Sequence, residues 1–229
     1  MPNEIIPYIE MCLREGVSLQ RGMNFQIGKN HSVILMSVRQ GSPYEDRYED
    51  DGSTIIYEGH DVPRSRQYPD PKSLDQPEFT PANNLTENGK FHFSAQSYKN
   101  SNSDPERVRV YEKIKQGIWS YNGIFHLVDS WLEKCNGRKV FKFKLIAVEG
   151  EENFDIPTQK HAKHRRIIPT QVKLQVWKRD GGKCTKCGAD KDLHFDHIIP
   201  FSKGGSSDTV DNIQLLCGRH NLQKHNKIE

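Results

Sequence analysis

Residues 184–221 read CTKCGADKDLHFDHIIPFSKGGSSDTVDNIQLLCGRHN, and this stretch decides the fold of the C-terminal part of the chain. It contains two pairs of potential metal ligands, Cys184-x-x-Cys187 and Cys217-x-x-His220. Each pair has the spacing with which a tight turn binds one side of a tetrahedral zinc ion. We therefore expect a structural zinc ion bound by these four residues, because a module this small buries too little apolar surface to fold on its core alone.

Between and after the two ligand pairs lie residues suited to phosphodiester hydrolysis. Asp196-His197 precedes Ile-Ile-Pro, Asn212 follows a Gly-rich loop, and Asn221 comes directly after the second pair. Histidine titrates near neutral pH and can activate water, whereas an adjacent carboxylate is a hard ligand for Mg²⁺. Successive side chains of a strand point to opposite faces, so this interpretation requires the strand to twist or end at His197.

Residues 176–225 resemble an HNH endonuclease of the four-ligand zinc type. That family's pattern is Cys-x-x-Cys, Asp-His-Ile-Ile-Pro, Gly-Gly, Asp-Asn-Ile and a second zinc pair. The resemblance implies a ββα-metal fold in which His197 is the general base, and Asn212 orients it and holds the loop. It also implies that Asp196 and Asn221 bind the catalytic cation, Mg²⁺ or another divalent ion.

One departure from the family pattern concerns His220, because many relatives have a cysteine there. If His220 bound the catalytic ion, the zinc would keep three protein ligands, but the spacing from Cys217 favours zinc. Lys224 could steady the phosphate, although solvation is the simpler interpretation for a lysine on a short surface helix. His194 and His225 are expected to be bystanders.

The preceding 150 residues are rich in short strand-like runs. Val, Ile, Phe and Tyr are concentrated in segments separated by Asn, Gly, Asp and Pro, which predicts strands. The segments are residues 31–37, 53–59, 90–98, 107–111, 123–131 and 139–148. A helix is expected over residues 6–15 and should stop at Gly16. The predicted fold class is therefore α+β, with a curved, barrel-like β domain followed by a small zinc-braced ββα-metal domain.

Four ordered segments of the β domain resemble the SET- and RING-associated (SRA) domain, which binds modified cytosine by flipping it out of the helix. The first two are residues 16–22 and residues 41–59, the latter with Gly-Ser-Pro-Tyr-Glu-Asp and Tyr-Glu-Gly. The others are residues 75–91, with Asp-Gln and Leu-Thr-Glu-Asn, and residues 121–143, with Tyr-Asn-Gly and Val-Phe-Lys-Phe. The resemblance spans residues 10–150, and it implies that loops over residues 60–90 and 95–106 enter the DNA grooves.

By this resemblance, Tyr44 and Tyr57 stack on the two faces of the flipped base, and a carboxylate accepts a hydrogen bond from the cytosine amino group. Stacking and hydrogen bonds to the Watson–Crick edge recover the few kcal/mol that extrusion costs. We assign the carboxylate to Asp46, although the family's carboxylate lies one residue further from the first tyrosine. The alternatives are Glu45, Asp50 and Asp51.

Charge is unevenly distributed along the 229 residues, whose net charge is +3. Residues 156–229 contain 14 Lys or Arg and 7 Asp or Glu, a net charge of +7, which leaves −4 for residues 1–155. A basic C-terminal third is consistent with binding to a polyanion such as DNA. It is equally consistent with an ordinary solvated basic surface. We predict an SRA-like domain over residues 1–153, a basic linker over 154–169 and a nuclease domain over 170–229, whose first helix is capped by Thr170.

The composition argues against membrane-spanning, secreted and disulfide-rich classes of protein. No stretch is long and apolar enough to cross a bilayer, and the N-terminus lacks the order of a signal peptide, so a cytoplasmic location is expected. Five cysteines are too few for a disulfide framework in a chain of this size.

The two resemblances imply a type IV-like, modification-dependent restriction endonuclease acting on double-stranded DNA near 5-methylcytosine or another 5-substituted cytosine. One HNH site cuts one strand, so a double-strand break implies a homodimer or two binding events. The alternatives are a zinc-stabilised binder of modified DNA that does not cleave, and a general nicking or homing nuclease whose N-terminal part only positions DNA.

Overall fold

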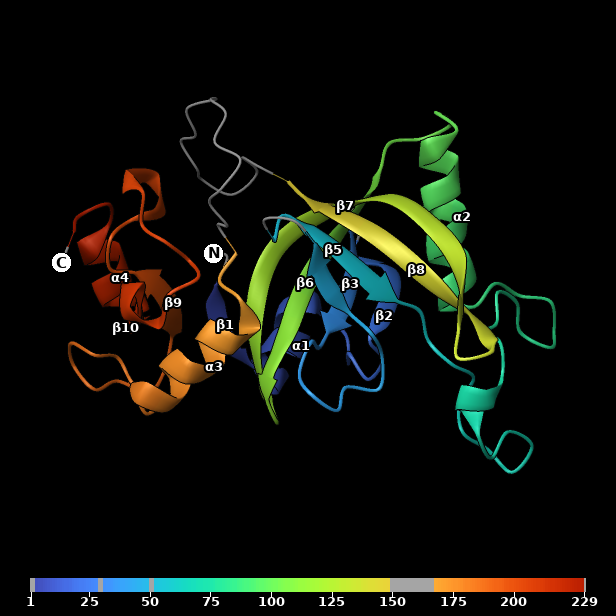
Figure 1. Ribbon diagram of the computed structural model, residues 1–229, viewed down its shortest axis with the longest axis horizontal. Helices are drawn as coiled ribbons and strands as arrows, with labels where there is room; N and C mark the ends of the chain where they lie inside the picture. The colour runs from blue at the N-terminus through green and yellow to red at the C-terminus, as the bar shows by residue number, and fades with distance from the viewer. Residues whose placement is uncertain (1–2, 29–30, 50–51, 149–166, 229) are drawn as a thin grey trace.

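The computed structural model describes residues 3–28, 31–49, 52–148 and 167–228, and these residues form a mixed α and β structure (Figure 1). The strands are β1 (Glu4–Pro7), β2 (Met23–Gly28), β3 (His31–Met36), β4 (Arg47–Glu49), β5 (Thr54–Glu58), β6 (Glu106–Lys115), β7 (Ile118–Cys135), β8 (Arg138–Ala147), β9 (Leu193–His197) and β10 (Ile213–Cys217). The helices are α1 (Tyr8–Glu15), α2 (Glu87–Lys99), α3 (Thr170–Arg179) and α4 (Gly218–Lys224), with short 3₁₀ turns at Pro71–Ser73, Phe201–Lys203 and Val210–Asn212. The predicted α+β class is confirmed.

All the described strands belong to one hydrogen-bonded sheet that runs through both parts of the chain. Its main path is β10-β9-β1-β7-β6-β3-β2, and a branch of β8, β5 and β4 joins it at β7. Strand β7 is 18 residues long and pairs with β6 along its first half and with β8 along its second half. Because one strand serves two neighbours in turn, the sheet bends around the main core, whose largest members are Tyr57, Phe91, Phe125, Phe141 and Phe143.

The β7–β8 hairpin turns at Asn136-Gly137, where both residues have positive φ (49° and 83°). That dipeptide is the preferred one for a two-residue hairpin turn, because its backbone twist matches that of the strands. The hairpin carries the Val-Phe-Lys-Phe run of β8, so its phenylalanines face the core while lysine side chains alternate with them.

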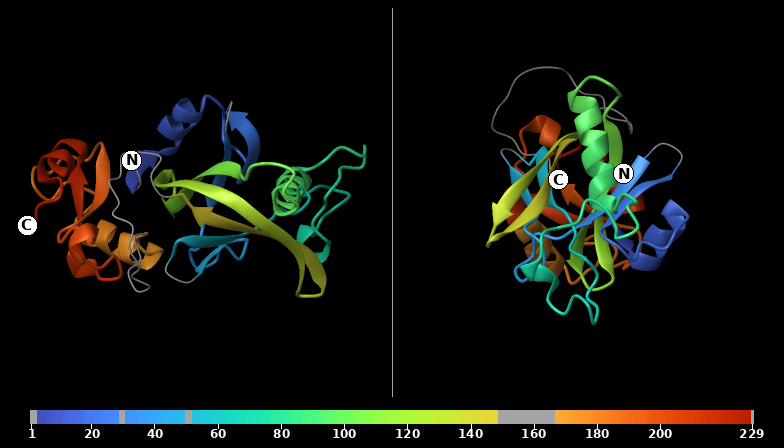
Figure 2. Two further views of the ribbon diagram at one scale, coloured as in Figure 1. Left: turned by 90° about the horizontal axis from the view of Figure 1, so that it is seen from above. Right: turned by 90° about the vertical axis from the view of Figure 1, so that its right-hand side faces the viewer.

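The strand predicted over residues 90–98 is wrong, because this segment lies in helix α2. Thr86 caps the helix by accepting a hydrogen bond from the Gly89 N–H at 3.2 Å. The alternation in Phe91-His-Phe93 resembles a strand, but the apolar contacts follow helical spacing instead. Phe91 and Ala95 are buried, whereas Phe93 is 68% exposed. The helix packs on β7, at the end of the molecule opposite the C-terminal module (Figure 2).

The N-terminal helix begins two residues later than predicted and ends at the predicted place. Gly16, at φ 69°, ends α1 in the left-handed conformation that glycine adopts without strain. The residues before the helix form β1, which pairs antiparallel with β7 over Glu4–Pro7 and with β9 through Glu4. This short strand therefore joins the N-terminal sheet to the C-terminal module.

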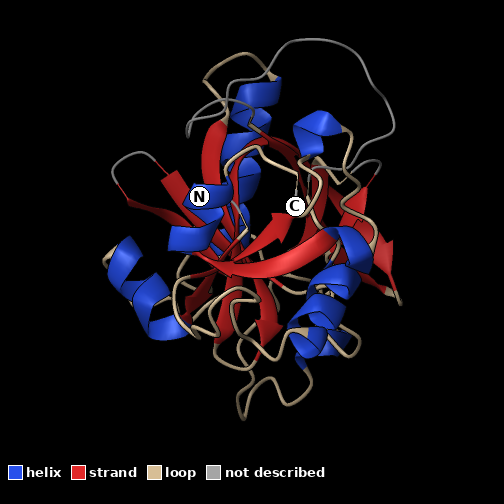
Figure 3. Ribbon diagram, turned by 90° about the vertical axis from the view of Figure 1, so that its left-hand side faces the viewer, coloured by secondary structure: helices blue, strands red, loops and turns tan. Residues whose placement is uncertain are grey.

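The C-terminal module lies at the end of the molecule that faces the viewer in Figure 3. It consists of α3, the β9–β10 hairpin and α4, and its hairpin and last helix have the strand, strand, helix order expected. It has its own core, formed by Val172, Val176, Leu193, Phe195 and Leu215 among others. Helix α3 does begin at Thr170, but Pro169 is its cap residue, and the Thr170 hydroxyl donates to Glu112 of β6 instead. The prediction that Thr170 caps the helix is therefore wrong.

Most of the predicted linker, residues 154–166, lies outside the described residues. Its last residues, 167–169, are described, and Ile168 is fully buried in the core of the C-terminal module. No helix within the described ranges has the length and apolar character needed to span a bilayer.

Candidate metal centre, nuclease site and base pocket

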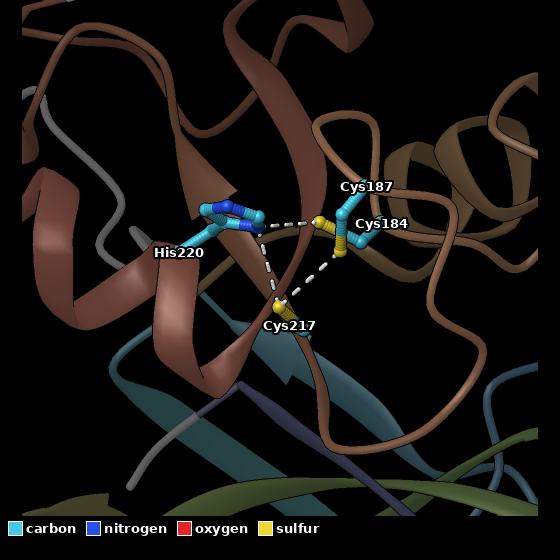
Figure 4. A group of neighbouring side chains, drawn as sticks. All are labelled: Cys184, Cys187, Cys217 and His220. Carbon is cyan, nitrogen blue, oxygen red and sulfur yellow. Dashed lines mark hydrogen bonds between the residues drawn. The ribbon is translucent and has the colours of Figure 1, made fainter.

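The four predicted zinc ligands converge at one point of the C-terminal module (Figure 4). Cys184 and Cys187 come from the turn after α3, Cys217 ends β10, and His220 lies in α4. The Sγ atoms of Cys184 and Cys217 each lie 3.4 Å from His220 Nδ1, and those of Cys187 and Cys217 lie 3.8 Å apart.

These separations fit a tetrahedral ion. Zinc bound to sulfur at about 2.3 Å and to nitrogen at about 2.0 Å gives ligand-to-ligand edges of about 3.5 to 3.8 Å. All four ligand atoms lie within 4.8 Å of one another. The donor set of three thiols and one imidazole can therefore hold one metal ion without rearrangement of the chain.

The knuckle around Cys184 also favours the thiolate form. Burial raises the pKa of a thiol, but the main-chain amides of Cys217, Cys187 and Lys186 and the His220 ring hydrogen-bond to the Cys184 sulfur and lower its pKa to about 6. Gly188, at φ 74°, closes the turn by donating its N–H to the Cys184 carbonyl at 2.8 Å. Thiolate is the form that binds metal.

His197 is the last residue of β9, so the strand ends where the nuclease interpretation requires it to end. Its Nε2 lies 2.7 Å from the Ser207 hydroxyl, which comes from the loop that connects β9 to β10. This hydrogen bond orients the imidazole, and no sequence motif had pointed to Ser207.

Asn212 holds the main chain that follows His197. Its Oδ1 accepts from the Ile199 N–H at 2.8 Å, and its Nδ2 donates to the carbonyls of Ile199 and Ser206 at 3.2 and 2.9 Å. Gly205 explains the Gly-Gly motif, because a Cβ there would lie 1.8 Å from the Ile199 carbonyl oxygen. The loop-holding role implied for Asn212 thus has a direct geometric basis.

Asp196 lies beside a buried cation. The ammonium of Lys224 is 3.1 Å from Asp196 Oδ2 and donates to the His197 carbonyl at 2.6 Å, and Gln214 Nε2 donates to the same carboxylate at 3.3 Å. The Lys224 side chain is only 1% exposed, so the expectation of a solvated lysine is wrong. Asn221, the other predicted cation ligand, lies in α4 three residues before Lys224.

The two histidines predicted as bystanders have different surroundings. His194 is buried where β9 meets β1 and β10, with Nε2 3.4 Å from Asp192, and burial lowers its pKa. His225 is exposed just after the end of α4.

In the N-terminal domain, the two predicted pocket tyrosines contact the same third ring, that of His60. The His60 ring stacks on Tyr44 with centroids 4.9 Å apart and planes at 11°. Its Nε2 lies 2.8 Å from the Tyr57 hydroxyl, and their ring centroids are 6.1 Å apart. Burial lowers the pKa of His60 to about 4, so the ring is neutral near pH 7. An imidazole therefore occupies space beside both rings that were predicted to sandwich a base.

The main chain at Gly22 lies directly against this ring cluster. A Cβ at Gly22 would lie 2.7 Å from His60 ring atoms and from the Tyr57 hydroxyl. Tyr57 itself is 1% exposed and belongs to the main core, whereas Tyr44 is half-buried. Lys72 lies over the Tyr44 ring, with Nζ 4.2 Å from the centroid.

Asp46 fixes the main chain beside this cluster. Its two carboxylate oxygens accept from the Ser37 and Glu58 N–H groups at 3.0 and 3.1 Å. Burial raises the pKa of Asp46 to about 7, although these hydrogen bonds and Lys142 oppose the shift. Asp46 also lines a cavity of about 330 Å³ together with Tyr44 and Arg47.

The alternative carboxylates differ from Asp46 in their exposure and contacts. Glu45 lines the same cavity, but its side chain is 66% exposed and its Oε2 lies 3.8 Å from Lys142 Nζ. Asp50 and Asp51 lie outside the described residues.

Comparison with protein-family models identifies a known domain in each part of the chain. The SAD/SRA domain model matches residues 9–151, well over half of the chain. The chain belongs to the SAD/SRA domain family. The HNH endonuclease model matches residues 184–227, which include the metal cluster, His197 and Asn212. An SRA domain joined to an HNH endonuclease domain makes this chain a modification-dependent DNA endonuclease.

Two solved structures illustrate what this SRA–HNH protein is similar to. The SRA domain of SUVH5 in complex with hemimethylated CG DNA is 24% identical, with 66% of this chain and 90% of that chain covered, at a TM-score of 0.44. The type IV phosphorothioation-dependent restriction endonuclease ScoMcrA is 15% identical, with 99% of this chain and 55% of that chain covered, at a TM-score of 0.45. TM-scores below 0.5 describe loose superpositions, so the family assignment rests on the two domain matches. No curated protein matches the sequence significantly.

Besides Ser207, the side chain of His60 was missed by sequence reasoning, and the burial of Lys224 was not expected. His60 follows Tyr57-Glu-Gly59 directly, and that position in the pocket segment is the only sequence signal for it. Lys224 lies one helical turn after His220, on the helix that carries a metal ligand. Spacing alone could have placed Lys224 near the site, but only the fold shows its burial.

Proposed function

We propose that this SRA–HNH chain flips a 5-methylcytosine, or another 5-substituted cytosine, into its N-terminal domain and cuts a nearby phosphodiester bond at its C-terminal site. One observation supports this proposal above the others. His197 ends its strand on a module braced by four metal ligands, beside a carboxylate, with the following loop fixed by Asn212. A base, a carboxylate and a rigid frame are what hydrolysis of a phosphodiester needs.

In this proposal His197 removes a proton from the attacking water, and the Ser207 hydroxyl holds the imidazole in place. Asp196 and Asn221 would hold a divalent cation, Mg²⁺ in our assignment, which stabilises charge on the scissile phosphate when bound. The metal of the four-ligand cluster is assigned as zinc and serves structure only, because all four of its positions are filled by protein ligands.

For the base, we assign Tyr44 and Tyr57 as the stacking rings and Asp46 as the acceptor for the cytosine amino group. Each carboxylate oxygen has two lone pairs, so Asp46 can accept from a base while it keeps its bonds to Ser37 and Glu58. Since one nuclease site cuts one strand, we further propose that a double-strand break takes two protomers or two binding events.

The test is cleavage of a panel of duplexes that carry cytosine, 5-methyl-, 5-hydroxymethyl- or glucosylated hydroxymethylcytosine, with Mg²⁺ and with EDTA. We expect Mg²⁺-dependent cutting of at least one modified duplex in preference to the unmodified one. His197→Ala should reduce the rate by about 10²- to 10⁴-fold while DNA binding persists. His225→Asn, which changes an exposed histidine, is the matched control. Equal cutting of all duplexes would indicate a general nuclease, and binding without cutting would indicate a reader of modified DNA.

A further inference from the structure

The junction between the two domains is a continuous piece of sheet. Strand β1 pairs with β7 of the SRA domain on one side and with β9 of the nuclease module on the other. The Phe195 N–H donates to the Asn3 carbonyl at 3.1 Å, which extends this contact by one residue. The strand that carries Asp196 and His197 is thus hydrogen-bonded to the same sheet that supports the base pocket.

A buried ion pair forms a second connection across the junction. Lys173 of α3 lies 2.9 Å from Glu112 of β6, and both side chains are completely buried. Lys173 also donates to Asn122 Oδ1 at 2.8 Å, and the Thr170 hydroxyl donates to Glu112. A shift of α3 within the docked junction would leave a buried charge without its partner, so the pair favours this one docked arrangement.

The same network reaches the pocket segment. The Tyr48 hydroxyl donates to Glu112 at 3.1 Å and accepts from Asn122 Nδ2 at 2.6 Å. Tyr48 lies in β4, two residues after Asp46, and both line a cavity of about 360 Å³ together with Thr170 at the start of α3. The first turn of α3 and the strand next to the predicted base reader therefore share Glu112 as a hydrogen-bond partner and line one cavity.

The other end of α3 is fixed to the nuclease site. Arg179 donates to the carbonyls of Val210 and Ile213 at 2.8 and 2.7 Å, on both sides of Asn212 in the chain. Asp180 accepts from the Leu215 N–H of β10 at 2.9 Å. Helix α3 thus bridges the pocket segment and the loop that holds the catalytic arrangement.

We propose that the Glu112–Lys173 pair is a positioning element that fixes the nuclease site relative to the base pocket. The docked junction, and not the length of the linker, then sets the distance between the modified cytosine and the cut. This inference rests on the proposed function for its readout. Glu112 and Lys173 are positioning residues, because they act through α3 and do not touch the DNA that reacts.

The test maps cut positions at nucleotide resolution on a duplex with one modified cytosine. An insertion of six Gly and Ser residues after Pro157, within the linker, should leave the cut positions of the full chain unchanged. Lys173→Glu, which sets a like charge against Glu112, should spread the cuts over several neighbouring phosphates. The double variant Glu112→Gln with Lys173→Gln leaves no unpaired charge and provides a second, milder disruption with the same expected direction. Lys178→Glu, on the exposed side of the same helix, is the matched control.

Small-angle X-ray scattering of the same proteins without DNA measures whether the two domains stay docked, independently of cleavage. The insertion variant should keep the radius of gyration of the parent, and Lys173→Glu should increase it. Cut positions that move with the insertion would overturn the proposal, as would unchanged single cuts in the folded double variant. If the parent does not prefer modified DNA, the proposed function fails while the scattering result still decides the docking.

Discussion

The ammonium of Lys224 lies 3.1 Å from the carboxylate of Asp196, and the side chains of the two residues are only 1% and 13% exposed. A divalent cation that binds Asp196 would therefore sit next to a positive charge that water screens poorly. The same ammonium donates a hydrogen bond to the His197 carbonyl, so it also stabilises the end of β9. Lys224 would thus oppose metal binding at the carboxylate, while it supports the strand that carries His197.

Lys224→Gln should separate these two effects, because the amide can still donate to the His197 carbonyl but carries no charge. We expect the Mg²⁺ concentration for half-maximal cleavage to fall by about tenfold, which corresponds to ~1.4 kcal/mol of removed repulsion. The measurement is the cleavage rate across a Mg²⁺ titration. Lys227→Gln, an exposed lysine just beyond α4, should leave the titration unchanged. A half-maximal concentration that stays the same or rises in Lys224→Gln would contradict this account.

Removal of the metal from the four-ligand cluster should unfold the nuclease module and spare the pocket. Cys187→Ser deletes one ligand, so the protein should lose one equivalent of zinc by elemental analysis and lose cleavage. Tyr57 of the predicted pocket lies in a core separate from that of the nuclease module, and binding of modified DNA should therefore persist. Cys135→Ser removes a thiol outside the cluster and should keep both metal and activity. Full cleavage by a zinc-free protein would refute the structural role.

The metal cluster and the end of β9 could be predicted from sequence because their information is local. Two x-x spacings place ligands on tight turns, and Asp-His before Ile-Ile-Pro places a strand end. The strand β1 could not be predicted, since its last two residues, Ile6 and Pro7, were expected to begin the helix that follows it. Its pairing depends on β7 and β9, more than 100 residues away. The helix α2 was missed because Phe91-His-Phe93 mimics a strand over three residues.

The other features that could not be predicted depend on contacts between residues far apart in the sequence. Lys173 and Glu112 are 61 residues apart, and each alone looks like an ordinary surface charge. The pocket carboxylates form a run in which position does not reveal burial, and only the fold shows Asp46 engaged by two main-chain amides. His60 has no periodic pattern around it, so its stacking on Tyr44 could be found only in the structure.

Recognition of the modified base should depend on pH through Asp46. Burial raises the pKa of Asp46 to about 7, with Glu58 raising it further and Lys142 opposing the shift. The carboxylate is the form that accepts from a cytosine amino group, so affinity for modified duplex should rise with pH. Only about a tenth of such a group is ionised one pH unit below its pKa, which predicts roughly tenfold weaker binding at pH 6 than at pH 8.

The control for that pH profile is Asp46→Asn, which should flatten it, together with binding to unmodified duplex measured over the same range. The effect on folding has the opposite sign. Because the folded pKa lies above the ordinary value near 4, the associated stability is fully present below pH 4 and is lost as pH rises through 7. Stronger binding of modified DNA at pH 6 than at pH 8 would remove Asp46 from the role of acceptor.

His60 should act against entry of the base, because its ring occupies the space beside both Tyr44 and Tyr57. A flipped cytosine can stack on Tyr44 only after the imidazole withdraws, and an aromatic stack of this kind contributes about 0.5 to 1.5 kcal/mol. His60→Ala should therefore bind modified duplex about two- to tenfold more tightly, as measured by fluorescence anisotropy. His126→Ala, at a half-buried histidine of β7, is the matched control and should bind as the parent does. Weaker binding by His60→Ala, with its fold intact, would mean that the imidazole contacts the base and does not exclude it.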